Sequence, residues 1–240
     1  MKPTKITKIH RHGFFTRSLK TIIRLFKTKP TIFNQNETFN DQSIFICNHS
    51  GAGGPFSLSL FFPKLFVPWG AHPMTEGYIA RWKYLYHTFY QQKLKYGKIR
   101  SFLISTPFAL ISKMLYNGMH VIPTYTDMRV RNTFEISKKH LNIGNSVLIF
   151  PEDSQDGYHE ILQFYNGGFV YLALDYYKTY GIDLPVYPVY YNQMKNAILI
   201  EKPHFLQNYI KMGFRRDQIA DKFKNLTNEM RDGLNDLLRI

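Results

Sequence analysis

The chain has 240 residues and a formal net charge of +14, from 31 Lys and Arg against 17 Asp and Glu. This length suits one domain and is sufficient to bury a sizeable core. Cys47 is the only cysteine, which excludes an internal disulfide and is typical of a reducing compartment. No stretch has the run of roughly eighteen apolar residues that a membrane span needs, so we expect any membrane contact to be peripheral.

The positive charge is concentrated at the N-terminus. Residues 1–30 hold nine Lys or Arg and no acidic residue. Such an asymmetry indicates an anionic partner, either a nucleic acid or an acidic lipid surface. We expect residues 1–40 to form a basic membrane-contacting segment and residues 41–240 to form the main domain.

Within that segment, the spacing predicts a helix over Phe14–Lys27. Its bulky apolar residues fall on one stripe: Phe15, Leu19, Ile22 and Phe26. Its cations fall on another: Arg17, Lys20, Arg24 and Lys27. An apolar face bordered by cations is typical of a helix lying in a lipid interface. The alternative is an amphipathic helix docked on the protein with solvated lysines outside. Nucleic acid is less favoured, because the apolar residues form a face instead of alternating with the cations as stacking groups would.

After Pro30 the polar stretch Thr31–Gln42 is expected to be a connection. The expected strands are Ile44–Cys47, Leu65–Trp69, His120–Tyr125, Ser146–Phe150, Leu184–Tyr190 and Ala197–Ile200. The expected helices are Pro55–Phe62, Tyr78–Gln92, Ser101–Asn117, Thr133–Asn142, Leu162–Tyr180 and 217–239. This alternation predicts an α/β fold, with a mostly parallel mixed sheet flanked by helices. The last two strands lie too close together for a helical crossover, so we expect them to be antiparallel.

Two polar turns follow apolar strands and are candidates for a functional site. The first has Asn48 and His49 followed by three glycines, namely Gly51, Gly53 and Gly54. The second has Glu152, Asp153 and Ser154. In open α/β sheets the clefts lie at the carboxyl ends of strands, and small residues let a substrate approach the backbone. The alternative is that Asn48 merely turns the chain and His49 is incidental.

Four stretches in order carry a resemblance to a known family. They are Asn48-His49 after its strand, Gly118–Thr126, Asn142–Asp153 with its Phe-Pro-Glu, and Leu184–Val189. Together they resemble the sequence blocks of the glycerolipid acyltransferases, the lysophosphatidic acid acyltransferase group. The resemblance implies a glycerol-phosphate-acyltransferase-like fold. It covers about residues 40–205, and its most specific part is Phe-Pro-Glu.

The chain departs from the family pattern in three places. The family has His, four residues and then Asp, and Gly54 stands at that position here. An arginine usual in the second block would fall near Thr126. The third block usually continues Gly-Thr-Arg, where this chain has Asp153, Ser154 and Gln155. These departures put the usual acceptor and full activity in doubt.

The resemblance implies that His49 takes a proton from the hydroxyl of a lysophospholipid or related glycerolipid, which then attacks an acyl thioester. The donor would be acyl-CoA or acyl carrier protein, with no bound cofactor and no metal. In the family, the aspartate orients the histidine, and we expect Asp153 to take over that role. The alternative for Asp153 is a loop residue that hydrogen-bonds its own backbone.

The remaining candidates are groups expected to bind substrate. Arg129 and Arg131 could reach the acceptor phosphate, since an arginine fork suits that group; the alternative is two solvated surface cations. Asn48, Glu152 and Ser154 would line the site, and the backbone N–H groups of Gly51–Gly54 could bind an oxyanion.

We therefore predict an acyltransferase peripheral to the cytoplasmic face of an anionic membrane, with no specific nucleic-acid partner. A catalytically weak or inactive lipid-binding protein on the same scaffold is the first alternative, favoured by Gly54. A basic nucleic-acid-binding protein is the second, and the apolar stripe of the N-terminal helix is evidence against it.

Overall fold

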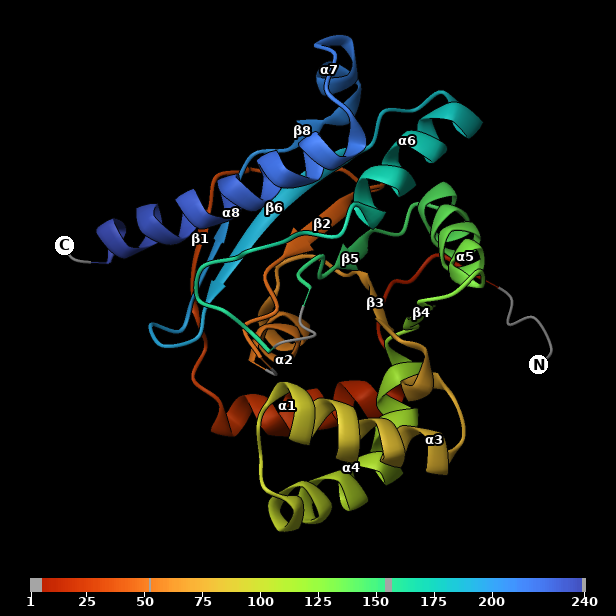
Figure 1. The fold of residues 1–240 in the computed structure, drawn as a ribbon, viewed down its shortest axis with the longest axis vertical. Helices are drawn as coiled ribbons and strands as arrows, with labels where there is room; N and C mark the ends of the chain where they lie inside the picture. The colour runs from red at the N-terminus through yellow and green to blue at the C-terminus, as the bar shows by residue number, and fades with distance from the viewer. Residues whose placement is uncertain (1–5, 52, 154–156, 239–240) are drawn as a thin grey trace.

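The structure, a computed structural model, describes residues 6–51, 53–153 and 157–238. Its centre is an eight-stranded sheet with the order β1-β7-β6-β2-β5-β3-β4, and β8 pairs with β6 (Figure 1). The strands are β1 Thr31–Asn34, β2 Ile44–Cys47, β3 Val67–Ala71, β4 Ile122–Thr124, β5 Val147–Ile149, β6 Pro185–Asn192, β7 Ala197–Ile200 and β8 His204–Phe205. The predicted α/β class with a mostly parallel mixed sheet is confirmed.

The middle of the sheet is parallel. β2 lies between β5 and β6 and pairs in parallel with both. β6 and β7 are antiparallel, as their short connection predicts. The prediction of a plain connection over Thr31–Gln42 is wrong at its start, because β1 pairs in parallel with β7 from Thr31 to Asn34. β1 is an edge strand with partly exposed side chains, so its sequence lacks the apolar run of a buried strand.

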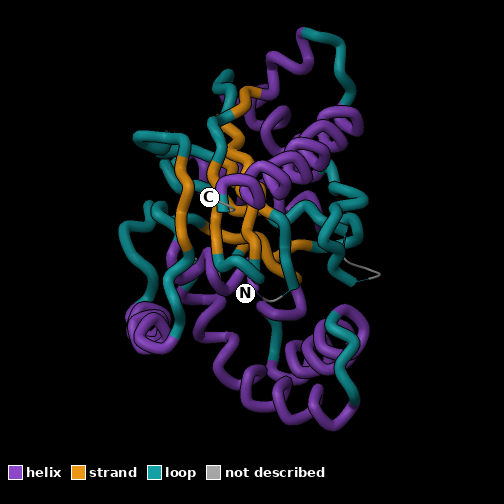
Figure 2. Tube along the Cα trace, turned by 90° about the vertical axis from the view of Figure 1, so that its left-hand side faces the viewer, coloured by secondary structure: helices purple, strands orange, loops and turns teal. Residues whose placement is uncertain are grey.

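Helices surround this sheet on several sides. They are α1 Phe14–Phe26, α2 Gly53–Phe61, α3 Tyr78–Lys83, α4 Lys98–Gly118, α5 Val130–Asn142, α6 Gly168–Tyr180, α7 Leu206–Lys211 and α8 Arg216–Leu237, with a 3₁₀ turn at His72–Thr75 and a π-helix at Tyr84–Lys93. In Figure 1, α7 is at the top, α6 is at the upper right and α8 crosses in front of the strands, while α1, α3 and α4 form a helical lobe below the sheet. Figure 2 shows the same division between the strands and the lower helices.

The two faces of the sheet carry separate apolar clusters. One includes Ile44 and Ile46 of β2 together with Phe169 of α6 and Phe223 of α8. The other includes Phe45 and Cys47 of β2 with Leu58 of α2. Alternate residues of β2 thus face opposite sides, and all four are buried, as expected for the centre of a parallel sheet.

The predicted helix over Leu162–Tyr180 is wrong in its first turns. α6 begins only at Gly168. Leu162 and Tyr165 are buried, but in a loop whose backbone is bound by a side chain of α8. Asn228 accepts a hydrogen bond from the Leu162 N–H at 2.9 Å and donates one to the Leu162 carbonyl at 3.1 Å. The apolar residues of this segment therefore reflect burial rather than helical periodicity.

The helical lobe has its own small core of Met74, Leu85, Tyr90 and Ala109. The sequence predicts one helix over Tyr78–Gln92, whereas the structure has the short α3 followed directly by the π-helix. π-Helical segments are rare and occur frequently at functional sites. This one ends at Lys93, whose place beside the candidate site is described below.

α1 docks on α4 through its polar side. Thr16 is buried against Gly118, where a Cβ would collide with the Thr16 side chain. The Gly13 N–H donates to the Gly118 carbonyl at 3.0 Å. Lys20 is also buried on this side, whereas Phe26 is 86% exposed. The helix thus presents much of its apolar surface outward, the reverse of an ordinary docked amphipathic helix.

Across the described residues, we find no helix that is both long enough and apolar enough to pass through a bilayer.

Candidate active site

Asn48 and His49 stand at the carboxyl end of β2, between the ends of β5 and β6. Asn48 is buried and joins two strands. Its Oδ1 accepts a hydrogen bond from the Tyr191 N–H at 2.8 Å, and its Nδ2 donates to the Tyr191 carbonyl at 3.0 Å. Both ends of its amide are therefore occupied by β6. Asn48 therefore fixes the position of the neighbouring His49. This role differs from the substrate contact that we expected of Asn48.

His49 is partly exposed as a residue, and its imidazole is held by three groups. Its Nδ1 is hydrogen-bonded to the carbonyl oxygen of Gly51. Its ring stacks on Tyr158, with centroids 4.6 Å apart and planes 21° apart, and lies 5.0 Å from the Phe150 ring. A carbonyl oxygen only accepts hydrogen bonds, so Nδ1 carries the hydrogen and Nε2 keeps its lone pair. This tautomer suits a base that acts through Nε2.

Electrostatics favour the neutral form of this ring. Burial lowers the pKa of His49 from 6.5 to about 4, the hydrogen bond to Gly51 opposes that shift, and the charge of Lys93 adds to it. The imidazole is therefore unprotonated at neutral pH and available to accept a proton. Among the described residues no carboxylate shifts its pKa, so protonation receives little stabilisation from them.

Glu152 supports the backbone of the histidine turn rather than the ring. Its Oε2 accepts a hydrogen bond from the backbone N–H of His49 at 2.9 Å. Burial raises the pKa of Glu152, and hydrogen bonds from the backbones of His49 and His159 and the charge of Lys93 oppose the rise. β2 and β5 are adjacent and parallel, which explains why these two polar turns meet.

The orienting role that we expected for Asp153 stays a prediction, and the structure places another group at the nitrogen concerned. The nitrogen that Asp153 was expected to orient is held by the Gly51 carbonyl. The backbone N–H of Asp153 donates to the Phe164 carbonyl at 3.4 Å. Its negative charge acts instead on Lys93, where it and Glu152 raise the pKa against the lowering effect of burial. Ser154 lies outside the described residues.

The glycine-rich turn has a steric reason for lacking an aspartate. At Gly54 an added Cβ would collide with the carbonyl oxygen of His49 and lie 3.0 Å from its carbonyl carbon. It would also lie 3.2 Å from the Asn48 carbonyl oxygen. These are backbone atoms, so no rotamer change relieves the collision. At Gly53 the clash is with the flexible end of Gln193, and Gly51 has a φ of +62° that favours glycine.

Arg129 and Arg131 are not brought to His49 by any contact that the described residues make. Arg129 pairs with Asp127 at 2.7 Å and its guanidinium lies 4.6 Å from the centre of the Tyr125 ring. The side-chain hydrogen bonds from Arg129 lower the pKa of Asp127 to about 2. Arg131 is exposed on α5. Both arginines fit the alternative of solvated surface cations better than the expected contact with an acceptor phosphate.

Sequence reasoning missed Lys93 and Tyr158. Tyr158 comes from the loop after β5 and its ring stacks on His49, and Lys93 comes from the end of the π-helix and its charge lowers the pKa of His49. Neither lies in a motif, and nothing in the spacing of either residue relates it to the histidine.

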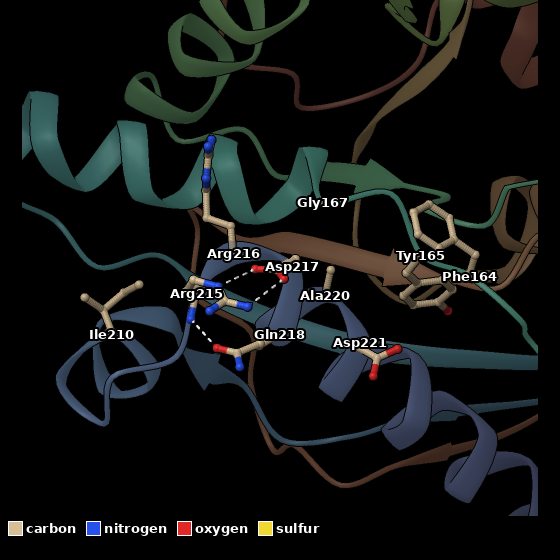
Figure 3. A pocket seen from close by; sticks show the side chains of 10 residues that line it. All are labelled: Phe164, Tyr165, Gly167, Ile210, Arg215, Arg216, Asp217, Gln218, Ala220 and Asp221. Carbon is tan, nitrogen blue, oxygen red and sulfur yellow. Dashed lines mark hydrogen bonds and ion pairs between the residues drawn. The ribbon is translucent and has the colours of Figure 1, made fainter.

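A cavity of about 980 Å³ lies on another part of the molecule, between α7 and the starts of α6 and α8 (Figure 3). None of the predicted site residues lines it. Its lining residues are Phe164, Tyr165, Gly167, Ile210, Arg215, Arg216, Asp217, Gln218, Ala220 and Asp221. Arg215 is bound within this group, since it contacts Asp217 at 3.4 Å and its backbone N–H donates to Gln218 (Figure 3).

In the part of the chain that the structure describes, no group of three or more His, Cys, Asp or Glu is arranged to hold a metal ion. Comparison of the chain with models of protein families and with curated proteins finds no match in either case.

Proposed function

We propose that the protein transfers an acyl group from a thioester to the hydroxyl of a lysophospholipid or related glycerolipid, with His49 as general base, on a glycerol-phosphate-acyltransferase-like fold. The observation that carries the proposal is the fixed tautomer of His49 at the carboxyl end of a central parallel strand. The hydrogen on Nδ1 leaves Nε2 available as the base. The sequence resemblance supplies the reaction class.

In the proposed reaction, Nε2 of His49 accepts the hydroxyl proton while the acceptor oxygen attacks the thioester carbonyl carbon. The tetrahedral intermediate then expels the thiolate as the C–S bond breaks, and the imidazolium returns its proton to the sulfur. The products are an ester and a thiol. Gly51 orients the ring as the motif carboxylate would, but it carries no negative charge to stabilise the imidazolium. Removing the corresponding carboxylate function from a serine protease costs roughly 10⁴ in rate, so we expect slow turnover.

Lys93 is the cation that we assign to this site. Its charge lowers the pKa of His49, and the charges of Asp153 and Glu152 raise the pKa of Lys93. The backbone carbonyl of Lys93 lies 3.6 Å from the Cβ position of Gly157, in the same loop as Tyr158. A cation there would stabilise the oxyanion of the tetrahedral intermediate or the phosphate of the acceptor. This role replaces the one expected of the two surface arginines.

Contact with a membrane is supported by the outer surface of the helical lobe. Exposed apolar side chains are present on both long helices of the lobe, with Phe14, Ile22, Leu25 and Phe26 on α1 and Ile99, Phe102, Leu103, Leu110 and Met114 on α4. Basic residues near an anionic membrane each add about 1 kcal/mol of attraction. We propose that this surface rests on an anionic bilayer and that the acyl donor, acyl-CoA or acyl carrier protein, approaches from the aqueous side.

A lipid-binding protein without turnover is the second candidate. It is favoured by the contact of Nδ1 with a neutral carbonyl in place of any carboxylate of the described residues, and by the low pKa of the ring, both of which weaken the base. The two candidates share the membrane surface and differ only in whether a new ester forms.

Purified protein on anionic vesicles, given lysophospholipid and labelled acyl-CoA or acyl carrier protein, distinguishes the candidates. We expect labelled diacyl product from the wild type and none above background from His49→Ala. His159→Ala is the matched control, since it removes an exposed histidine from the neighbouring loop. Binding of lysophospholipid by the wild type without product would establish the second candidate. Equal product from His49→Ala would refute the catalytic role of His49.

A further inference from the structure

The ring of Tyr158 lies over the imidazole of His49. Their centroids are 4.6 Å apart and their planes are 21° apart, so the two rings are stacked nearly in parallel. The ring of Phe150 is 5.0 Å from the same imidazole but is tilted by 57°. Tyr158 therefore presents the π face of its ring to a face of the imidazole, whereas Phe150 meets the imidazole at a steep angle.

The turn before Tyr158 packs on the end of the π-helix. Gly157 is buried and has a φ of +110°, a backbone conformation that other residues rarely adopt. Its Cβ position is 3.6 Å from the carbonyl oxygen of Lys93, the last residue of the π-helix. The helical lobe thus helps to fix the backbone from which the Tyr158 ring extends.

The stacked ring complements the hydrogen bond that His49 makes through Nδ1. That bond to the Gly51 carbonyl restrains one edge of the imidazole more than it restrains the tilt of the ring. A second ring stacked on the face sets the plane of the imidazole. The lone pair of Nε2 lies in this plane, so an acceptor hydroxyl and the Tyr158 ring contact different parts of the base. The stack can therefore aim Nε2 without occupying it.

The charged groups described around His49 do not stabilise a protonated ring. The charge of Lys93 lowers the pKa of His49. The carboxylate of Glu152 is bonded to the backbone N–H of His49 at 2.9 Å, and the charge of Asp153 acts on Lys93. His159 is exposed, and its charge acts on Glu152. Within the described part of the chain no carboxylate raises the pKa of the imidazole, so an imidazolium formed there needs another source of stabilisation.

We infer that Tyr158 is a positioning residue that holds the plane of His49 and stabilises its imidazolium through the π face of the tyrosine ring, an inference that rests on the acyl transfer proposed above. A cation over the face of a tyrosine ring, within about 6 Å of the centroid, is attracted by the negative charge of that face. The imidazolium forms at 4.6 Å. This attraction increases the proton affinity of the base by roughly twofold to thirtyfold, and it replaces part of what a carboxylate would supply.

Burial of the imidazole has the opposite effect on its protonation. Burial is the largest cause that lowers the pKa of His49 to about 4. If Tyr158 acted only as an apolar cover, its removal would admit water and raise that pKa. If its π face acts on the imidazolium, an apolar side chain without a ring at the same place lowers the pKa further. The two roles therefore predict changes of opposite sign.

The test compares Tyr158→Leu with Tyr158→Phe in the full chain. Leucine keeps an apolar side chain over His49 and removes the π face, whereas phenylalanine keeps the ring and removes the hydroxyl. Tyr177→Leu is the matched control, because it removes a tyrosine that is 40% exposed on α6. Nuclear magnetic resonance of the imidazole, without substrate, gives the ring-current shift of its carbon-bound protons. It also gives the protonated fraction at the pH at which the wild-type ring is half protonated. Single-turnover acyl transfer on anionic vesicles is the third readout.

We expect Tyr158→Phe and Tyr177→Leu to match the wild type in all three readouts. Tyr158→Leu should lose the ring-current shift and be less protonated at the chosen pH. It should transfer the acyl group roughly twofold to thirtyfold more slowly, with the same half-saturating concentration of lysophospholipid. Equal protonation in Tyr158→Leu and Tyr158→Phe, or a Tyr158→Leu variant that is more protonated or faster than the wild type, would overturn the inference.

The inference and the proposed function can fail separately. Protonation of His49 is measured without substrate, so it tests the role of Tyr158 even if the wild type transfers no acyl group. Transfer that depends on His49 and is unchanged in Tyr158→Leu would overturn the role of Tyr158 and leave the proposed function in place.

Discussion

Placing at Gly54 the aspartate of the motif that the chain resembles is predicted to damage the protein instead of improving it. In Gly54→Asp the Cβ collides with the His49 carbonyl oxygen and lies 3.0 Å and 3.2 Å from two further backbone atoms. Backbone atoms at the end of a central strand cannot move away as the tip of a side chain does. The substitution must therefore displace the His49 peptide, which is also held by Glu152 at 2.9 Å.

Overpacking a well-packed region costs typically about 1–3 kcal/mol. Gly54→Ala adds only the Cβ and so tests the steric collision alone. We expect it to lower the free energy of unfolding by at least about 1–3 kcal/mol. Gly54→Asp should cost more, because it adds a charge near the buried Glu152. The matched control is Gly233→Ala: Gly233 lies inside α8 with nothing within 4 Å of its Cβ position. There alanine should stabilise by about 0.5–1 kcal/mol through its higher helix propensity.

Urea unfolding followed by circular dichroism gives the free energies for all three variants and the wild type. We expect alanine to lower the free energy of unfolding at Gly54 and to raise it at Gly233. Any transfer activity of Gly54→Asp should be below that of the wild type. A Gly54→Ala variant as stable as Gly233→Ala, or a Gly54→Asp variant more active than the wild type, would refute the steric account.

Three further predictions follow from the structure. The pKa of His49 falls from 6.5 to about 4 on folding, so the unfolded chain binds this proton more readily than the folded chain. The free energy of unfolding should therefore fall as the pH drops from about 6.5 to about 4. Urea unfolding measured at a series of pH values should show a smaller fall for His49→Gln. Leu25 and Phe26 are 78% and 86% exposed, so the double variant Leu25→Asp and Phe26→Asp should weaken flotation with vesicles without changing the free energy of unfolding. Met194→Asp, at a position that is 83% exposed, is the control and should leave flotation unchanged. Asn48→Ala leaves the backbone of β6 without two hydrogen bonds and should lower the unfolding free energy by about 1–3 kcal/mol, measured by urea unfolding.

Strands buried on both faces were the easiest elements to predict from sequence. Ile44–Cys47 and Ala197–Ile200 have the predicted bounds, because each is a run of apolar residues between polar ones. The edge strand at Thr31–Asn34 has no such run, since solvent reaches part of each side chain. Periodicity also showed that α1 has two different sides, but it does not determine which of them docks on α4.

The candidate site was predictable only where it follows from strand order. His49 and Glu152 meet because each stands just after one of two adjacent parallel strands. The ring of Tyr158 stacks on His49 and the charge of Lys93 acts on it from distant segments of the chain, which no local pattern encodes. The contact of Nδ1 of His49 with the Gly51 carbonyl was likewise not predictable, because every residue has a backbone carbonyl and the sequence does not show its direction.

The most direct test of the proposed chemistry is the pH dependence of single-turnover acyl transfer on anionic vesicles. With His49 as a base of pKa about 4, the wild-type rate should rise with pH and be level from about pH 5 to pH 8. His49→Ala should be slower by roughly 10²-fold or more throughout, the typical contribution of a general base. A wild-type rate that keeps rising with pH up to pH 8, or a variant that transfers the acyl group as fast as the wild type, would contradict the account.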